Sequence, residues 1–383
     1  MSDKLITLVN ATSEPDKQGF DAQKLANVSK VVQRGLDERI YPVAVWLVMR
    51  GGAIVTQGAL GNIQPNVVAS SPATLDTIFD VASITKMFTA ALLLQHAEAG
   101  DLHLGQRIID FLPESDGSPA ANLTLRQLAT HTSGLPPWIA LHAAKRGRLA
   151  EIFAAPLTAE PGTRYAYSDL GYILLGEILT RLTQTPLDPL GHKRIFQPCD
   201  MTRTGYRPSA TLRPQIAATA NCPARPDKIL VGEVHDANAW SMGGVAGHAG
   251  VFSTATDLAR FFHSLQTGKI FHSAARHLFQ ENQIDPKIGG HSIGCFTSPN
   301  PMLPHGDLLS KQTFGHTGFT GTLFLHDPDN DITLILLTNR VYCQPESGGI
   351  SKIRRQFANA VAGAIKEFEP QRTRRDTEKK QTG

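Results

Sequence analysis

The sequence predicts an α/β (α+β) protein in which strands from both ends of the chain form one antiparallel sheet flanked by helices, with an all-helical lobe inserted between them. Three observations support this prediction. Apolar and β-branched runs occur near both ends, at 43–58 and 320–339. The region from about 101 to 285 has mostly helical patterns separated by long loops. No internal repeat divides the 383 residues, which suffice for one large domain or two.

The N-terminal region predicts a helix followed by a hairpin. Residues 1–20 are expected to be partly ordered at best. Apolar residues at positions 25, 28, 32 and 36 lie on one side of a predicted helix over 21–40, which Pro42 ends. The runs 43–49 and 53–58 surround Arg50-Gly51-Gly52, as is typical of a hairpin. A linker rich in Pro, Ser and Asn follows over 62–74.

Residue patterns in the middle of the chain predict three helices near the candidate functional segments. They cover 123–131, 170–182 with Ser168 or Asp169 at its start, and a stretch through Leu265 capped by Thr256 or Asp257. Pro161-Gly162-Thr163 forms a turn between the first two.

The C-terminal region returns to strands, at 320–326 and 332–339, joined by an acidic turn. A last helix is predicted over 351–367, and the charged tail 367–383 is expected to be disordered. We therefore expect one domain over 21–366. Its α/β lobe covers about 21–82 and 286–366, its helical lobe covers about 101–285, and a cleft separates the two lobes.

Composition excludes several functions. Hydrophobic residues make up 41% and charged residues 19%, with a net charge of +3, as in ordinary globular proteins. No basic stripe with interleaved aromatic residues is present, so no nucleic acid partner is expected. No stretch reaches the roughly 18–20 apolar residues of a membrane span. The N-terminus lacks the long apolar segment of a signal peptide, which predicts a cytoplasmic location unless a leader precedes this sequence, in which case the location is periplasmic.

The four cysteines lie at 199, 222, 295 and 343, without metal-like spacing. This pattern favours buried free thiols over disulfides.

Ser83 and Lys86 are the first candidate pair. They lie three residues apart at the start of an Ala- and Leu-rich stretch, so a helix would place both side chains on one face. A serine nucleophile needs a base for its proton and donors for the oxyanion. A helix start supplies free N–H groups. Alone, the S-x-x-K pattern also fits an N-capping serine followed by a surface lysine.

Tyr167 and Asp169 are the second candidate pair, in a loop that leads into the helix at 170–182. A nearby cation favours a phenolate, so Lys86 is expected to keep Tyr167 partly ionised. Tyr167 would then deprotonate Ser83 and later protonate the leaving group. The alternative is a core tyrosine beside an N-capping aspartate.

The third candidate is a small-residue segment directly before the strand at 320–326, with the sequence Gly315-His316-Thr317-Gly318-Phe319-Thr320-Gly321. Small residues let a ligand approach the backbone. We expect the N–H groups of Ser83 and Phe319 to form an oxyanion hole. We expect His316, Thr317 and Gly318 to contact the substrate. An edge strand with a glycine bulge is the alternative.

Together the three segments resemble a known family, the penicillin-recognising serine enzymes, which comprise class C β-lactamases, DD-peptidases and related carboxylesterases. The motifs S-x-x-K at 83–86, Tyr-Ser-Asp at 167–169 and His-Thr-Gly at 316–318 occur in the order used by that family. The surrounding sequence is similar at 79–86, 125–136 and 161–172. The stretch 232–240 with the loop 243–250 resembles a subgroup near the type-4B penicillin-binding proteins. The resemblance covers roughly residues 21–366.

This resemblance implies a β-lactamase/transpeptidase-like fold with Ser83 as the acylated nucleophile and Lys86 and Tyr167 as the proton-transfer pair. It implies a small-molecule or peptide acyl substrate, no metal and no cofactor. The oligomeric state does not follow from it.

Two positions depart from the family pattern. Asp169 stands where lactamases usually carry Asn, and an ionised carboxylate cannot donate a hydrogen bond to a substrate carbonyl. We expect Asp169 to pair with Lys86 instead. His316 stands where they usually carry Lys, so the permanent cation that suits a substrate carboxylate is replaced by a weaker, pH-dependent one. Both changes favour esters or amides without that carboxylate.

The predicted function is therefore a serine hydrolase that acts through an acyl-Ser83 intermediate on carboxylic esters or related acyl compounds. The alternatives are a DD-carboxypeptidase or β-lactamase-type penicillin-binding enzyme, and a non-catalytic sensor on the same scaffold.

Two other patterns were considered as sites. Gly290-His291-Ser292-Ile293-Gly294 matches the G-x-S-x-G nucleophile elbow, but prolines at 299, 301 and 304 forbid the helix that must follow it. His131, His235 and His248 lie in loops expected near the cleft. They lack metal-ligand spacing, so structural roles are predicted for them.

Overall fold

The computed structural model describes residues 12–65, 70–222, 224–343 and 348–366. Within the predicted partly ordered segment 1–20, the described residues include a 3-10 turn at Pro15–Gln18 and a bridge between Thr12 and Ile54. The prediction of a disordered tail at 367–383 falls outside the described residues.

The larger sheet has six strands in the order β2-β1-β9-β8-β7-β6, and every neighbouring pair is antiparallel. Its strands are β1 (Val43–Arg50), β2 (Ala53–Gly61), β6 (Phe296–Thr297), β7 (Phe314–Thr317), β8 (Leu323–Asp327) and β9 (Ile332–Thr338). The predicted sheet from both chain ends is confirmed, because N-terminal β1 pairs directly with C-terminal β9. His316 and Thr317 end strand β7, in line with the strand alternative for this segment, and Gly318 follows the strand.

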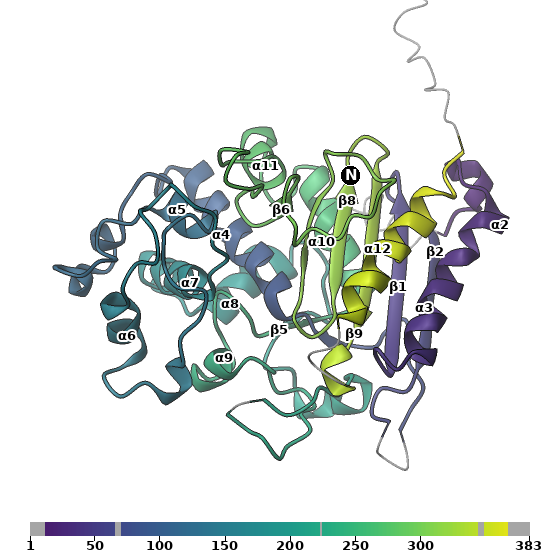
Figure 1. Cartoon of the computed structure of the whole chain (residues 1–383), viewed down its shortest axis with the longest axis horizontal. Helices are drawn as coiled ribbons and strands as arrows, with labels where there is room; N and C mark the ends of the chain where they lie inside the picture. Colours follow the sequence, from purple (N-terminus) through teal and green to yellow (C-terminus); the bar gives the residue numbers. More distant parts are fainter. Residues whose placement is uncertain (1–11, 66–69, 223, 344–347, 367–383) are drawn as a thin grey trace, which may run out of the picture.

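Side chains alternate between the two faces of this sheet. On β1, Ala44, Trp46 and Val48 face α3 (Asn27–Asp37) and α12 (Gly349–Ala362), which pack against each other. Their β1 neighbours Val45 and Leu47 face the other way, into a cluster that includes α10 (Ala255–Gln266). Figure 1 shows α3 in purple and α12 in yellow side by side over the sheet. Successive side chains of β1 point to opposite faces of the sheet, and both faces are buried. This explains why β1 is apolar throughout.

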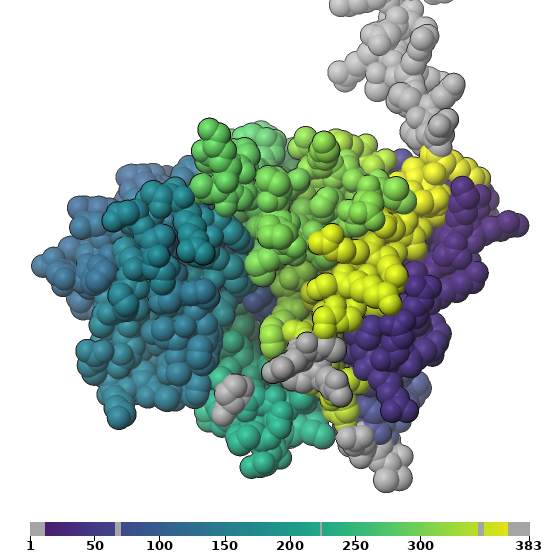
Figure 2. All heavy atoms as spheres, viewed as in Figure 1, coloured from purple at the N-terminus to yellow at the C-terminus, as the bar shows by residue number. Residues whose placement is uncertain are grey.

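The remaining helices lie mostly in the inserted lobe at the left of Figure 1. They are α4 (Thr85–Ala99), α5 (Leu125–Ala129), α6 (Arg148–Ala154), α7 (Asp169–Thr183), α8 (Leu187–Gly191), α9 (Ala237–Ser241) and α11 (Ser273–Gln280), and α2 (Ala22–Leu25) precedes α3. In Figure 2 the blue and teal residues of this lobe occupy one side of the molecule, and the purple and yellow chain ends pack together on the other.

The structure differs from the sequence prediction at several helix boundaries. The predicted helix over 21–40 is divided at Ala26 into α2 and α3. The cap of α10 is Thr254, whose hydroxyl accepts from the N–H of Asp257 at 3.2 Å. The inserted lobe also holds β4 (Gly205–Tyr206) and β5 (Val251–Ser253), which form a small sheet with β3 (Phe79–Asp80) that we did not predict. Strand β3 delivers the chain to Ser83.

One apolar cluster joins the two lobes, since it contains Val45 of β1, Phe88 of α4 and Leu174 of α7. The predicted lobes therefore share a core, and the domain limits of 21–366 stay our proposal. All four cysteines are free thiols, and Cys199, Cys222 and Cys295 are buried as predicted. Among the helices of the described residues, none combines the length and apolar character that crossing a bilayer requires.

Candidate active site

Ser83 lies on a turn between β3 and α4 rather than on the α-helix itself. The residue before it, Ala82, has a φ of +49°, and residues 82–84 form a 3-10 turn that continues into α4. A non-glycine residue in this conformation stores strain, which is common next to functional groups. The Ala82 N–H donates to Oδ1 of buried Asp80 at 2.9 Å, which fixes the turn. Ser83 remains partly exposed.

Lys86 lies directly beneath Ser83. Its Nζ is 3.0 Å from Ser83 Oγ, 2.7 Å from Asp169 Oδ1 and 3.2 Å from the carbonyl oxygen of His248. These three acceptors use all three hydrogens of an ammonium group. The side chain has no exposed surface. The expected ion pair between Asp169 and Lys86 is therefore present, and a charged Lys86 donates to Ser83 instead of accepting its proton.

Tyr167 reaches the same serine from the loop before α7. Burial, followed by the nearby Asp169 carboxylate, raises the pKa of Tyr167 well above 10, although its hydrogen bond with Ser83 lowers the pKa in part. The Lys86 ammonium lies over the Tyr167 ring, 4.9 Å from its centroid. Our expectation of a partly ionised Tyr167 is not supported, because burial and Asp169 both oppose the phenolate. Tyr167 is a neutral phenol in this site.

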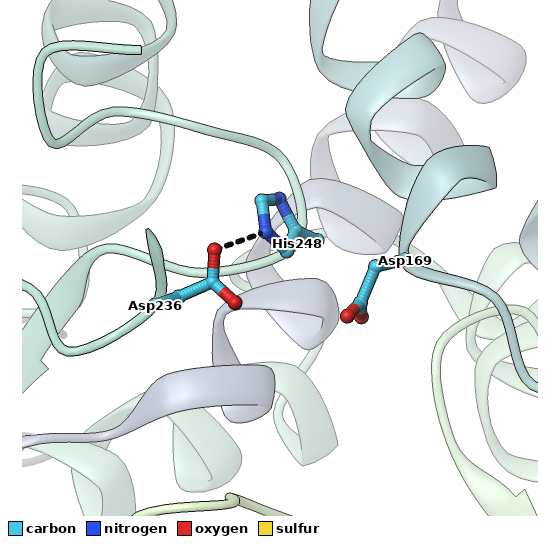
Figure 3. Close-up of side chains that lie close together, drawn as sticks. All are labelled: Asp169, Asp236 and His248. Atoms are coloured by element: carbon cyan, nitrogen blue, oxygen red, sulfur yellow. Dashed lines mark hydrogen bonds and ion pairs between the residues drawn. The ribbon is translucent and has the colours of Figure 1, made fainter. Parts of the chain in front are cut away.

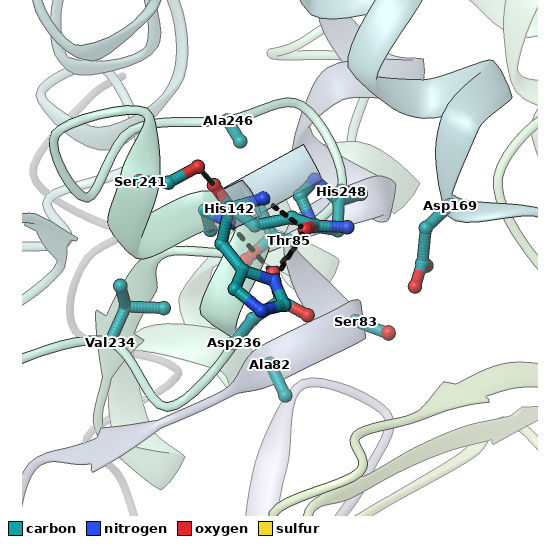
Figure 4. Close-up of polar contacts among 12 residues, drawn as sticks. Ala82, Ser83, Thr85, His142, Asp169, Val234, Asp236, Ser241, Ala246 and His248 are labelled. Carbon is teal, nitrogen blue, oxygen red and sulfur yellow. Dashed lines mark hydrogen bonds and ion pairs between the residues drawn. The ribbon is translucent and has the colours of Figure 1, made fainter. Parts of the chain in front are cut away.

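Asp236 and His248 form an acid–imidazole pair in this site, in addition to the Asp169–Lys86 ion pair, that the sequence did not reveal. His248 Nε2 is 2.9 Å from Asp236 Oδ1, which also accepts from the N–H of Ala239 at 2.7 Å (Figure 3). The pKa of Asp236 is lowered despite its burial, chiefly by His248. Figure 4 shows Ser83 in front of this group, with Asp236 on one side and Asp169 on the other. Asp236 is thus a permanent negative charge beside the nucleophile.

By type and spacing, Asp169, Asp236 and His248 resemble metal ligands, since one ligand atom of each lies within 4.8 Å of the others. Lys86 already donates to Asp169 and to the His248 carbonyl. Its ammonium therefore supplies positive charge to this cluster, and the absence of a metal role remains a prediction.

The β7–β8 turn is held against the nucleophile segment by two hydroxyl groups. Thr320 Oγ1 donates to Asp80 O at 2.8 Å, and Thr322 Oγ1 donates to Val81 O at 3.0 Å. A Cβ on Gly318 would lie 2.5 Å from Val81 O, so only glycine permits this approach. Phe319, at the tip of the turn, is 55% exposed and lines the same cavity as Ser83. This arrangement fits the expected pairing of the Ser83 and Phe319 N–H groups.

Ser83 opens into a cavity of about 640 Å³ between the lobes. We call one side of it the lysine wall, which consists of Tyr167, Asp169 and Asp236 backed by Lys86. We call a second group of lining residues the arginine wall, which consists of the turn Thr317–Phe319 with Arg340 and Arg354. Trp138, 43% exposed, also lines the cavity.

His316 is not among the described residues that line this cavity. Its side chain is 1% exposed and stacks on Phe296 with ring centroids 4.4 Å apart. Burial and the charge of Lys86 hold its pKa well below 6.5, so His316 is neutral. The expected contact with substrate is therefore not supported for His316, whereas Thr317 and Gly318 do face the cavity.

Arg354 supplies the positive charge that position 316 lacks. It comes from α12 and is 7% exposed, and its Nη2 donates to the carbonyls of Gly318 and Thr322, each at 2.8 Å. Its Nε is buried without a partner, and among the described residues no carboxylate pairs with this guanidinium. Burial lowers the pKa of Arg354 to about 9, and Arg340 adds to this effect. A buried cation without a counter-ion is costly unless a ligand supplies the negative charge.

The G-x-S-x-G alternative fails. Ser292 has no exposed surface, and its hydroxyl donates to Phe279 O at 2.6 Å. The segment Cys295–Phe296 that follows contains no helix.

The family model described as Beta-lactamase matches residues 28–356. The chain belongs to the beta-lactamase family. The resemblance predicted from the three motifs is confirmed, and so is the fold class. Membership in this family makes the chain a serine hydrolase.

Relatives within the beta-lactamase family include a protein of Escherichia coli (strain K12) named "Putative D-alanyl-D-alanine carboxypeptidase". It is 32% identical over 371 residues, which cover 86% of this chain and 85% of that protein. A protein of the same name from Salmonella typhi is 31% identical over 375 residues and has similar coverage, 87% and 86%.

Solved structures share the fold. EstCE1, "a hydrolase with promiscuous acyltransferase activity", gives a TM-score of 0.74 at 22% identity and covers 89% of this chain and 99% of its own. The class C beta lactamase from Rhodobacter sphaeroides gives 0.70 at 22% identity, with 88% and 98% covered. At such identity these likenesses establish the beta-lactamase fold alone.

Sequence reasoning missed Asp236, Arg340, Arg354 and Trp138 as members of this site. Asp236 has the sequence signal of a helix N-cap, and it does cap α9. Arg354 has the signal of a helix residue in a basic stretch. Only the approach of α12 to the β7–β8 turn reveals that Arg354 lines the same cavity as Ser83.

Proposed function

We propose that this beta-lactamase family member hydrolyses acyl compounds through an ester formed on Ser83. The observation that supports this most is the meeting of Ser83, Lys86 and Tyr167, which come from segments far apart in the sequence. Lys86 Nζ lies 3.0 Å from Ser83 Oγ and 4.9 Å from the centroid of the Tyr167 ring, and Ser83 and Tyr167 line the same cavity.

The neutral phenol favours a relay over a resting phenolate. Ser83 Oγ bonds to the acyl carbon while its proton moves to the Tyr167 oxygen. The original Tyr167 proton moves to the leaving atom, whose bond to the acyl carbon breaks. Water then attacks the ester by the reverse route, and the proton returns to Ser83.

Lys86 stays charged throughout this relay and stabilises negative charge that builds on the serine and phenol oxygens. The N–H groups of Ser83 and Phe319 stabilise the developing oxyanion. Asp169 and the His248 carbonyl fix the ammonium at its other two hydrogens. Each of these residues thus has a role that does not require an ionised tyrosine.

The substrate class we propose is an acyl compound that carries a carboxylate, such as a peptide with a C-terminal D-amino acid. No carboxylate among the described residues pairs with the Arg354 guanidinium of the arginine wall, and this supports the class, because a charged pair with a carboxylate is a strong contact for a desolvated arginine. The names of the relatives point in the same direction. This reverses the preference for esters or amides without a carboxylate that Asp169 and His316 suggested from the sequence.

Simple carboxylic esters are the second candidate. Their support is the large, partly aromatic cavity, whose wall includes Trp138 and Phe319. A non-catalytic sensor is the third, and it requires that Ser83 does not react.

Intact mass after incubation with a fluorophosphonate and with a labelled penicillin tests the nucleophile. We expect an adduct on the wild type and none on Ser83→Ala. Turnover of p-nitrophenyl esters, nitrocefin and a D-alanyl-D-alanine peptide then separates the candidates, with the peptide expected to be preferred. Turnover that persists in Ser83→Ala would overturn the mechanism, and no adduct with either reagent would favour the sensor.

A further inference from the structure

His131 occupies an unusual position next to the proposed relay. It follows α5 and has a φ of +57°, in the left-handed region that usually favours glycine or asparagine. Its side chain is only 1% exposed. A buried imidazole in this conformation requires compensating contacts, and these contacts converge on Tyr167.

Two hydrogen bonds connect His131 to both chain neighbours of Tyr167. The Ala166 N–H donates to the His131 carbonyl at 2.9 Å, and the Ser168 N–H donates to His131 Nδ1 at 3.0 Å. The imidazole therefore acts as an acceptor for a backbone N–H. With residues 166 and 168 both fixed by His131, the backbone of Tyr167 has little freedom to rotate.

The His131 ring also contacts the phenol ring itself. Its centroid lies 4.3 Å from that of Tyr167 and 5.2 Å from that of Tyr172. Tyr172 is fixed in turn, because its hydroxyl donates to Ala129 O at 2.9 Å. His131 thus restrains both the backbone and the ring of Tyr167.

The protonation state of His131 suits this role. Nδ1 must carry a lone pair to accept the Ser168 N–H, so the neutral ring carries its hydrogen on Nε2. Burial, together with the positive charge of Lys86, holds the pKa of His131 well below 6.5. The acceptor is available throughout the neutral range.

We propose that His131 is a positioning residue that aligns the Tyr167 hydroxyl between Ser83 and the leaving atom, by bonding the chain on both sides of Tyr167 and packing on its ring. This inference rests on the proposed function. A relay through one phenol needs two correct proton-transfer distances at once, and a misplacement of about 1 Å can cost about 100-fold in rate.

Two substitutions distinguish the contribution of the His131 hydrogen-bond acceptor from that of its aromatic ring. His131→Phe keeps an aromatic ring but removes the acceptor, whereas His131→Asn keeps an acceptor near the Nδ1 position and tolerates the positive φ. We expect His131→Phe to lower kcat by about 30–100-fold with KM changed less than about 3-fold. We expect His131→Asn to recover kcat to within about 5-fold of the wild type.

A matched control is His326→Phe, since His326 is also buried and packs on an aromatic ring, with its centroid 4.2 Å from that of Phe262. It lies on β8 outside the cavity, so its loss is expected to affect thermal stability and not kcat. If His131→Phe fails to fold, replacing the Ser168 amide by an ester removes the same donor and leaves His131 intact. We expect about a 10-fold loss of kcat from that change.

A double-mutant cycle locates the effect. In a Tyr167→Phe background, His131→Phe should reduce the rate of Ser83 acylation by less than about 3-fold further, because the group it positions is gone. Full kcat in His131→Phe, an unchanged rate with the 168 ester, or an undiminished loss in the Tyr167→Phe background would overturn the proposal. Activity that persists in Ser83→Ala would instead overturn the proposed function.

Discussion

The lysine wall and the arginine wall of the cavity handle charge in opposite ways. On the lysine wall, the Lys86 ammonium is saturated by three acceptors, and Asp236 is held by His248 and the Ala239 amide. On the arginine wall, Arg354 donates to two neutral carbonyls and has a buried Nε without a partner. Lys86 and Asp236 on the first wall have partners of opposite charge or imidazole character, whereas no carboxylate among the described residues pairs with Arg354 on the second wall.

This difference assigns catalysis to the lysine wall and substrate recognition to the arginine wall. Internally balanced charges keep their geometry when a ligand leaves, as a catalytic group must. An unbalanced buried cation gains most when a ligand brings the opposite charge. Substitutions on the lysine wall should therefore affect every substrate, and substitutions on the arginine wall should discriminate between substrates.

Lys86→Met should have the largest effect. It removes the ammonium while keeping a similar length, so the oxyanion and the phenol lose their nearby cation. We expect kcat/KM to fall by about 10³–10⁴-fold for esters and peptides alike. Lys30→Met, at an exposed lysine of α3, is the control for loss of a lysine charge. A loss confined to one substrate class would contradict the assignment of Lys86 to the lysine wall.

Arg354→Met should give a substrate-dependent loss. We expect the ratio of kcat/KM for a carboxylate-bearing peptide to that for a p-nitrophenyl ester to fall by about 10–100-fold. The control is Arg355→Met, because Arg355 is the next residue of the same helix and is exposed. An unchanged ratio in a folded Arg354→Met protein would remove the distinction between the walls.

Asp236→Asn should have a smaller effect that is the same for all substrates. The amide keeps an oxygen for His248 and Ala239 but removes the negative charge near Lys86. We expect kcat/KM to fall by about 3–10-fold, measured with both substrate classes. Asp285→Asn, at an exposed aspartate, provides the comparison. A fall in kcat/KM for the peptide alone would indicate that Asp236 contributes to substrate recognition rather than to catalysis.

Asp80→Asn tests the support under the lysine wall and should affect stability more than rate. Asp80 accepts from the N–H groups of Ala82 and His235 at 2.9 and 2.8 Å, and an amide can accept only one of them well. We expect the free energy of unfolding to fall by about 1–3 kcal/mol, measured in urea.

The pH dependence of this loss follows from the pKa of Asp80, which burial raises to about 6. The folded protein then holds this proton more tightly than the unfolded chain, so the group stabilises the fold below about pH 4 and loses that contribution as pH rises through about 6. The destabilisation by Asp80→Asn should be largest near pH 4 and smaller above pH 6. If the destabilisation by Asp80→Asn instead increased from pH 4 to above pH 6, the pKa of Asp80 would be lowered in the folded protein rather than raised.

Much of this architecture could be predicted from local sequence. The apolar runs of β1, β8 and β9 and the S-x-x-K motif follow from residue periodicity and helix signals, as does the Asp169–Lys86 pair once the family pattern is recognised. The 3-10 turn at Ser83, the neutral state of Tyr167 and the burial of His316 could not be predicted. The states of Tyr167 and His316 depend on desolvation by residues distant in sequence, and the turn depends on the hydrogen bond from Ala82 to buried Asp80. The role of Arg354 likewise depends on where α12 packs.

The pairing of β1 with β9 has a consequence for biosynthesis. The hairpin of β1 and β2 leaves the ribosome long before β9 is translated, so the β1 edge that pairs with β9 is open during that time. A premature stop codon before β9 would therefore leave an unpaired edge prone to aggregation and a polypeptide without Arg354. Ser83 and Lys86 are translated long before Arg354, so a partial product that ends before α12 lacks the arginine proposed to recognise the substrate.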